Sequence, residues 1–172
     1  MLCLIFVGEL VDSYVTECIE IRSKINRVIE VEIRRPLEWR GTMAPRDVNA
    51  WWKAYERFIL HYAKIAAEED VAMLSVGSEL GTTETWRDRW FALISKVQKS
   101  FRGKLVYSSN WDRFDKVSFW ERLDYMGVTA YNDLTPDANA SERDLTDAWR
   151  RVRAKLVEFS RSLALASGVR SL

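Results

Sequence analysis

The stretch V-A-M-L-S-V-G-S-E-L, from Val71 to Leu80, decides the fold because it predicts a buried strand that ends in a single carboxylate. Alternate side chains of a strand point to opposite sides. One predicted face is apolar and suits a layer of helices: Ala72, Leu74 and Val76. The other face becomes smaller and more polar toward its end: Met73, Ser75, Gly77 and Glu79.

Glu79 is the predicted functional centre of the chain. Ligands and catalytic groups of parallel α/β folds gather at the carboxyl ends of the strands, and Glu79 stands at such an end. If the surroundings are partly apolar, the pKa of its carboxyl is expected to rise, as a general acid requires. The alternative interpretation is an ordinary strand-to-helix turn with a solvated glutamate.

The rest of the chain alternates between strand and helix patterns. Further strands are expected at Val28–Ile33, Lys104–Asn110 and Asp124–Tyr131. Helices are expected from Pro45 to about Glu69, from a Thr83 cap to Gly103, at Lys116–Leu123, and from a Ser141–Asp144 capping box to Leu163. The first of these carries an apolar stripe expected to face the core: Val48, Trp51, Trp52, Tyr55, Phe58, Ile59, Tyr62, Ile65 and Ala66.

This order predicts an α/β fold with a parallel sheet and right-handed crossovers. The length of 172 residues indicates a single domain, residues 1–172. About four parallel strands with alternating helices are too few for a complete eight-stranded barrel, which needs at least about 200 residues. The chain is therefore either a small open α/β domain or part of a barrel.

Composition excludes several classes of function. Lys and Arg number 26 against 25 Asp and Glu, so the net charge of +1 gives no field for nucleic acid or an anionic membrane. Two cysteines without a C-x-x-C pattern and one histidine, His61, on a helix surface give no zinc site and no Ser-His-Asp triad. No metal and no cofactor is expected. The apolar opening M-L-C-L-I-F-V-G has no basic leader and is too short to span a bilayer, so the compartment stays open.

Polar and aromatic residues follow the predicted strand ends. Asn110 and Tyr131 are placed to hydrogen-bond sugar hydroxyls, and Trp111 and Trp39 to stack on a sugar ring. Glu79 is expected within about one side-chain length of Asn110 or Tyr131. Ordinary packing for the aromatic residues and a turn for Asn110 are the competing interpretations. The eight tryptophans of the chain favour carbohydrate over other ligands.

Several motifs, in order, resemble glycoside hydrolase family 113, a TIM-barrel family of retaining β-mannanases. They are W-R-G (Trp39–Gly41), W-W-K-A-Y from Trp51, S-V-G-S-E-L ending at Leu80, Y-S-S-N-W (Tyr107–Trp111) and F-W-E-R-L-D-Y-M-G-V-T-A-Y (Phe119–Tyr131). The resemblance covers roughly residues 36–160, leaving the edges 1–27 and 164–172 unassigned. It implies a partial TIM (β/α)8 barrel.

The resemblance also implies a role for Glu79. The family places its acid/base glutamate in a G-[ST]-E-L pattern, which falls on Gly77 to Leu80 and makes Glu79 the proton donor. Its nucleophile belongs to a segment resembling P-V-x-x-T-E-[IV]-G, which this sequence lacks. A truncated or frame-shifted hydrolase, inactive alone on its β-mannan-like oligo- or polysaccharide substrate, is therefore expected, with exposed sheet edges that favour self-association.

Two aspartates remain as candidates for the second carboxylate, and two other functions of the chain remain as alternatives. Retaining hydrolysis needs two carboxyl groups, and Asp112 and Asp133 lie just beyond neighbouring strand ends, although an Asp on a loop is more often a cap or a solvated residue. A non-catalytic carbohydrate-binding remnant or subunit would use the aromatic residues without chemistry. An α/β domain for a phosphorylated small molecule is disfavoured because no G-x-G-x-x-G or Walker-type loop follows a strand.

Overall fold

The computed structural model describes residues 4–6 and 39–167. It contains a sheet in the order β1-β4-β3-β2, with β1 Leu4–Phe6, β2 Met73–Ser78, β3 Lys104–Asn110 and β4 Tyr125–Thr129. β2, β3 and β4 are parallel, whereas β1 pairs antiparallel with β4. The α/β class is confirmed. The strand expected at Val28–Ile33 lies outside the described residues.

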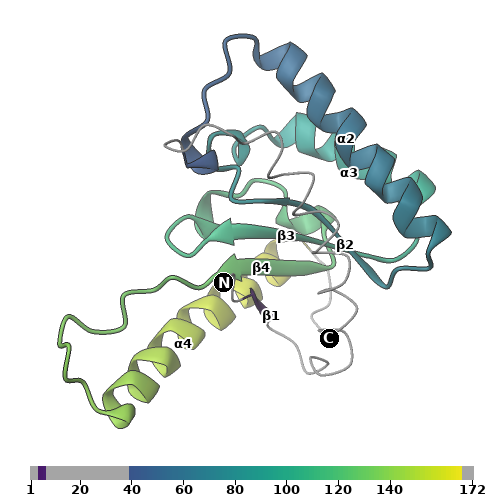
Figure 1. Ribbon diagram of the computed structural model, residues 1–172. Helices are drawn as coiled ribbons and strands as arrows, with labels where there is room; N and C mark the ends of the chain where they lie inside the picture. The colour runs from purple at the N-terminus through teal and green to yellow at the C-terminus, as the bar shows by residue number, and fades with distance from the viewer. Residues whose placement is uncertain (1–3, 7–38, 168–172) are drawn as a thin grey trace.

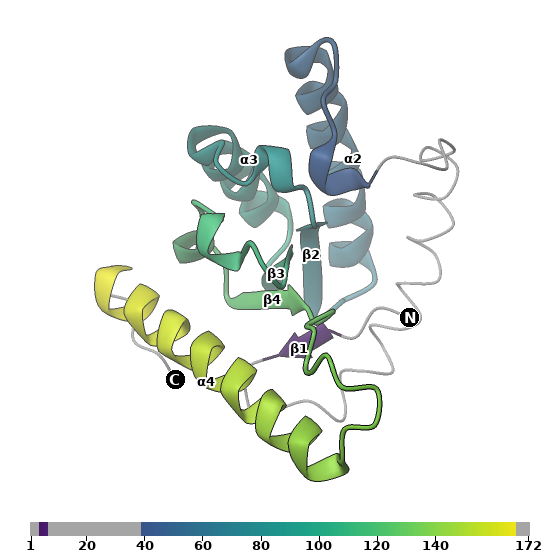
Figure 2. The ribbon, with the colours of Figure 1, turned by 90° about the vertical axis from the view of Figure 1, so that its left-hand side faces the viewer.

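Within residues 39–167, three helices accompany the parallel strands: α2 Val48–Glu68, α3 Arg87–Ser100 and α4 Glu142–Ser167. α2 and α3 lie side by side over β2 and β3, and α4 runs along the part of the sheet that contains β4 (Figures 1 and 2). This is the strand-helix alternation of a partial TIM barrel. No helix in the described part of the chain has the length and apolar character needed to cross a bilayer.

The core lies between these helices and the sheet. Trp90 of α3 stacks on Phe119 with ring centroids 4.3 Å apart and meets Tyr107 of β3 edge-on at 5.3 Å. Trp52 of α2 meets the same Trp90 ring at 5.2 Å, so one buried indole joins both helices to the sheet. Such edge-to-face pairs are favourable beyond the area that they bury.

Two apolar residues that the helical period places on a buried face are exposed. Ile65 of α2 is 38% exposed, whereas Ala63 is fully buried. Leu145, near the start of α4, is 37% exposed, and the helix instead packs through Leu156 and through Phe159, whose ring meets Phe114. The 3.6-residue period identifies a helix face correctly, but the packing partners decide how wide that face is.

The helix starts differ from the expected ones in two of three cases. α2 begins at Val48 because the Asp47 carboxylate accepts a hydrogen bond from the Ala50 amide, so Pro45 lies before the helix. Thr83 does not cap α3, since its hydroxyl donates to the Leu80 carbonyl. The Ser141–Asp144 capping box is confirmed: the Asp144 amide donates to the Ser141 hydroxyl, and the Asp144 carboxylate accepts from the Ser141 amide.

The short helix expected at Lys116–Leu123 is replaced by two single 3₁₀ turns, Phe114–Lys116 and Trp120–Arg122. Trp120 anchors the second turn to the first, because its indole N–H donates to the Phe114 carbonyl at 2.7 Å. Phe119, between the two turns, is fully buried against Trp90. The need to bury these large rings overrides the continuous helix that the local pattern favours.

β2 contains a β-bulge that the sequence did not predict. Ser75 pairs with Val106 and Gly77 with Tyr107, so Val76 is the extra residue. Gly77 therefore faces the helices rather than the opposite side: a Cβ there would lie 2.6 Å from the Tyr55 hydroxyl and 3.1 Å from the Trp90 ring. The expected face assignment is wrong at Gly77, because a bulge reverses the alternation of side chains.

Candidate active site

Glu79 lies directly after β2 and only 5% of its surface is exposed. Its backbone φ of 52° is in the left-handed region, which non-glycine residues adopt at a cost. Its amide donates to the Ser108 carbonyl of β3 at 2.7 Å. The strand thus ends in a sharp turn that is tied to the neighbouring strand.

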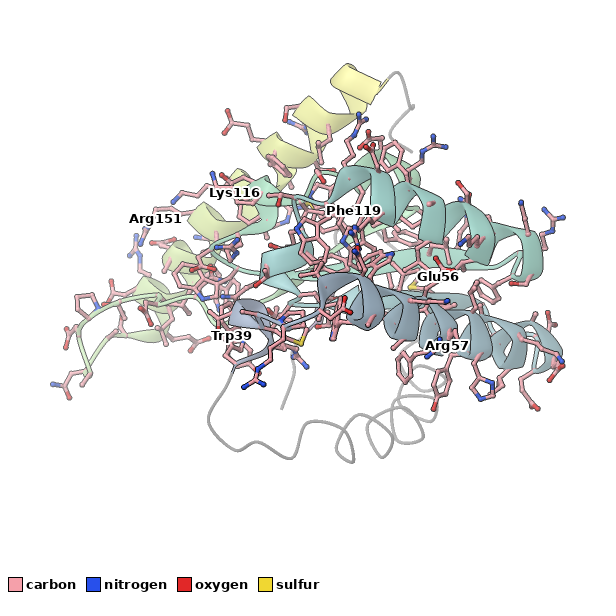
Figure 3. The ribbon with its side chains drawn as sticks, turned by 90° about the horizontal axis from the view of Figure 1, so that it is seen from above. Trp39, Glu56, Arg57, Lys116, Phe119 and Arg151 are labelled. Carbon is pink, nitrogen blue, oxygen red and sulfur yellow. The ribbon has the colours of Figure 1, made fainter. Side chains whose placement is uncertain are left out.

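Three donors from one segment hold the Glu79 carboxylate. Arg40 Nη2 and Nε donate to Oε2 at 2.9 and 3.2 Å, and Trp39 Nε1 donates to the same oxygen at 3.3 Å. Arg40 belongs to the 3₁₀ turn Arg40–Thr42, whose Gly41 carbonyl accepts from the Thr82 hydroxyl at 3.2 Å. Viewed from above, Trp39 lies beyond the N-terminal end of α2, whereas Glu56 and Arg57 lie along that helix (Figure 3).

The ends of β3 and β4 also contact the Glu79 carboxylate or its neighbours. Thr129 hydrogen-bonds to Glu79, and its hydroxyl lies 3.4 Å from the Asn110 side-chain oxygen. Asn110 and Thr129 are register partners. Glu79 and Asn110 therefore share contact with Thr129, and the carboxylate faces the strand ends rather than the helix-packed core.

The electrostatic state of Glu79 differs from the expected one. Burial raises the pKa of its carboxyl. The Thr129 hydrogen bond, the charge of Arg40 and the hydrogen bonds from Arg40 and Trp39 lower this pKa, and their combined effect is larger than that of burial. The net pKa lies below the ordinary value, and the expected rise is wrong for this arrangement. Cationic and donor neighbours outweigh desolvation because they stabilise the charged form directly.

A second carboxylate, Glu84, supports the loop that follows Glu79. Its side chain is fully buried and accepts from the Ser109 hydroxyl at 2.8 Å and the Tyr107 hydroxyl at 3.1 Å. Arg113 Nε lies 3.4 Å from its other oxygen. Burial, followed by the charge of Glu84, raises the pKa of Tyr107 and keeps its hydroxyl protonated as a donor.

The predicted sugar-binding residues occupy different environments. Trp39 is 42% exposed, and its indole lies so close to Gly41 that a Cβ there would be 2.2 Å from the ring. Tyr131 is 55% exposed and follows β4, with its amide donating to the Thr129 carbonyl. Trp111 is half-buried directly after β3. Of these three, Trp39 is brought into contact with Glu79.

The alternative carboxylates Asp112 and Asp133 are both exposed. Asp112 accepts from the Asn110 side-chain amide at 2.8 Å, which is the local turn contact expected of a loop aspartate. Within residues 4–6 and 39–167, no group of three or more Asp, Glu, His or Cys side chains is arranged to hold a metal ion. His61 is exposed on α2.

The structure adds three polar residues that sequence reasoning missed: Arg40, Thr129 and Glu84. Arg40 stands in the W-R-G motif, and Thr129 alternates in phase with Gly127 at the end of β4. Nothing in the local sequence distinguishes Glu84 from a solvated glutamate near the start of a helix.

Comparison with known proteins identifies the family. A complex structure of a family 113 β-1,4-mannanase has 29% identity and a TM-score of 0.53, covering 70% of this chain and 40% of that chain. The family 113 β-mannanase AaManA from Alicyclobacillus acidocaldarius, in complex with ManMIm, has 27% identity and a TM-score of 0.59, covering 78% and 40%. A further family 113 β-1,4-mannanase, at 24% identity and a TM-score of 0.57 over 81% and 48%, shares the fold.

The chain spans less than half the length of these three enzymes. Among curated proteins, none matches it. The sequence profile of the family, described as Glycoside Hydrolase Family 113, matches residues 33–164, most of the chain and all of the site around Glu79. The chain therefore belongs to glycoside hydrolase family 113.

Proposed function

We propose that this chain supplies the acid/base half of a retaining glycosidase site that cleaves β-1,4-mannosidic bonds, with Glu79 as the proton donor. The observation that carries the proposal is a nearly buried carboxylate in a left-handed turn at the carboxyl end of a parallel strand, held by Trp39, Arg40 and Thr129. Strained, buried carboxylates at this place in a barrel are typical of catalytic groups.

The chemistry needs two carboxyl groups about 5 to 5.5 Å apart. The first protonates the leaving oxygen while the second attacks the anomeric carbon, and the first then takes a proton from water as the sugar–enzyme bond breaks. In residues 39–167 the contacts of the Glu79 carboxylate are with donors, which favour the ionised form. A nucleophilic carboxylate nearby would raise the pKa of Glu79 by like-charge repulsion and prepare it as an acid.

The neighbouring side chains fit an oligosaccharide. The Trp39 side chain is partly exposed and hydrogen-bonds to Glu79, and the Asn110 side chain, a hydrogen-bonding group, contacts Thr129, which in turn contacts Glu79. Tyr131 and Trp111, at the ends of β4 and β3, would extend the contact to further sugar rings. On this proposal the substrate is a β-mannan or manno-oligosaccharide, and the chain alone does not hydrolyse it at a useful rate.

The proposal is tested by supplying a nucleophile from solution. Azide would attack the anomeric carbon of an aryl β-mannoside opposite the leaving group, the bond to the phenol oxygen would break, and the Glu79 proton would pass to that oxygen. We expect azide-dependent formation of the α-mannosyl azide from phenyl mannoside. Glu79→Gln should slow it by roughly 10² to 10⁴-fold, since general acid catalysis contributes that much. The azide reaction of dinitrophenyl mannoside, whose leaving group needs no proton, should be slowed little by Glu79→Gln.

Two other results would point elsewhere. Hydrolysis without azide, with retained configuration and loss in Glu79→Gln, would show that the chain supplies its own second carboxylate, with Asp112 and Asp133 the first to substitute. Binding of mannotetraose by both the unmodified chain and Glu79→Gln, without any azide product, would favour the non-catalytic carbohydrate-binding alternative. A Glu69→Gln variant, altered at an exposed glutamate beyond α2, is the matched control.

A further inference from the structure

The backbone from Val76 to Leu80 takes two irregular steps in succession. The bulge at Val76 reverses the side-chain alternation, so regular continuation of β2 would point Ser78 away from the helices and Glu79 toward them. The left-handed φ of Glu79 turns the chain instead, and the carboxylate reaches Thr129, Trp39 and Arg40. The position of the proposed acid therefore depends on an unfavourable backbone conformation.

Such a conformation persists only where the surroundings determine it. The residue after Glu79 is held by a buried relay: the Leu80 amide donates to the Tyr107 hydroxyl at 2.9 Å, and that hydroxyl donates to Glu84 at 3.1 Å. Tyr107 is fully buried between Trp90 and Phe119, so its hydroxyl has a fixed position. The relay ties the turn to the core of the molecule.

Glu84 is the end of this relay. It is fully buried, and its Oε1 accepts from both Tyr107 and Ser109. Arg113 approaches its other oxygen and also the Gly81 carbonyl, each at 3.4 Å. A buried carboxylate is costly unless it is paired and hydrogen-bonded. A neutral residue would fill the same space without the cost of burying a charge, so the presence of a carboxylate here calls for a physical reason.

We propose that Glu84 is a positioning residue for Glu79, acting through the Tyr107 hydroxyl on the Leu80 amide to hold the left-handed turn. The inference rests on the proposed acid/base role of Glu79. Glu84 itself does not touch the substrate in this proposal. Ser109 and Arg113 fix the carboxylate of Glu84, and Glu84 fixes the orientation of the tyrosine hydroxyl that receives the Leu80 amide.

The test measures the turn without any assay of activity. The pKa of the Glu79 carboxyl is followed by ¹³C NMR, with Glu79→Gln to assign the signal, and the Leu80 amide is followed by hydrogen exchange. In Glu84→Ala and Tyr107→Phe, we expect the Glu79 pKa to rise and Leu80 exchange to become about tenfold faster, because the turn relaxes away from Arg40 and Thr129. Glu84→Gln should retain both values, since its amide oxygen can accept the same two hydroxyl bonds.

Val97→Ala removes two methyl groups from a fully buried side chain on α3 and controls for a general loss of stability. It should leave the Glu79 pKa unchanged and should not speed the exchange of Leu80 more than that of other buried amides. If Glu84 acted only through its charge, Glu84→Ala and Glu84→Gln would both lower the Glu79 pKa and Tyr107→Phe would leave it unchanged. That result, or unchanged Leu80 exchange in Tyr107→Phe, would overturn the proposal. Because both readouts are independent of turnover, failure of the azide reaction would count against the proposed function alone.

Discussion

At the scale of single residues, the site is defined by one carboxylate oxygen that accepts hydrogen bonds from two neighbouring residues. Trp39 and Arg40 both donate to Glu79 Oε2, and Thr129 adds a further bond to the carboxyl group. Charge-assisted hydrogen bonds of this kind are roughly twice as strong as neutral ones. The hydrogen bonds and the ion pair with Arg40 together favour the ionised form of this side chain.

Removal of the Arg40 charge should reveal this control. In Arg40→Gln, the Glu79 pKa should rise, because burial, which raises it, is then opposed by fewer groups. An NMR pH titration of the Glu79 carboxyl measures the change. Arg57→Gln, at an exposed position on α2 (Figure 3), removes the same charge elsewhere and should leave the pKa in place. Equal shifts in the two variants would contradict a specific Arg40–Glu79 pair.

The same pair should make stability depend on pH. Because the folded pKa of Glu79 is lower than its ordinary value of 4.5, the ionised group stabilises the fold above that value. This contribution is lost as pH falls through the folded pKa. Urea unfolding of the unmodified chain and of Glu79→Gln should therefore show a difference in free energy that is constant near neutral pH and declines below pH 4.5. A difference that grows on acidification would contradict the assigned direction.

At the scale of elements, the end of β2 depends on tyrosines from its neighbours. The bulged Val76 carbonyl accepts from the Tyr55 hydroxyl of α2 at 2.6 Å, and the Leu80 amide donates to Tyr107 of β3. Gly77 lies between these two tyrosines, where a Cβ would be only 2.6 Å from the Tyr55 hydroxyl and 3.0 Å from the Tyr107 ring. The bulge is thus a built feature of the helix–sheet interface, and Tyr55 has two tasks, packing and hydrogen bonding.

Tyr55→Phe separates these two tasks. The ring packing on Trp51 and Trp90 is kept, but the Val76 carbonyl loses its donor. A buried polar group left unsatisfied costs about 1 to 3 kcal/mol, so the free energy of unfolding should fall by that amount in a urea titration. Tyr62→Phe, which removes a hydroxyl from another partly buried ring of the same helix, should cost less than about 0.5 kcal/mol. Equal losses would show that the bulge carbonyl does not need Tyr55.

At the scale of the whole molecule, the described sheet is open. β2 is its outer strand on one side, and β1 pairs antiparallel with β4 on the other. An open edge offers unpaired amides and carbonyls to another chain. The expected self-association through sheet edges remains a prediction, and its location is the β2 edge, where Ser75 is exposed.

A single lysine on that edge should reduce association. We expect the unmodified chain to form larger species as its concentration rises in sedimentation velocity experiments, and Ser75→Lys to shift the distribution toward the monomer, because a charged edge strand resists pairing. Ala54→Lys places the same charge on the exposed side of α2 and should have no such effect. A chain that stays monomeric at all concentrations would rule out association through this edge.

The sequence by itself determined the order of elements, the α/β class, the family and the place of Glu79 at a strand end. These follow from local patterns: a period of 2 in the strands, a period of 3.6 in the helices, and short motifs. The same patterns located β2, β3, β4 and the helices α2, α3 and α4, with errors at two helix starts and at the short helix expected at Lys116–Leu123. The two starts were shifted by local hydrogen bonds, from the Ala50 amide to Asp47 and from the Thr83 hydroxyl to the Leu80 carbonyl. The short helix was replaced because Phe119 is buried against the distant Trp90.

Only the tertiary structure decided which groups surround Glu79 and how it is ionised. Arg40 lies 39 residues before Glu79 in the chain, and Thr129 comes from a different strand. The bulge at Val76 and the left-handed turn at Glu79 are also invisible in the sequence, because they are held by Tyr55 and Tyr107 from other elements. A pKa depends on the distances between such groups, and chain folding alone brings them together.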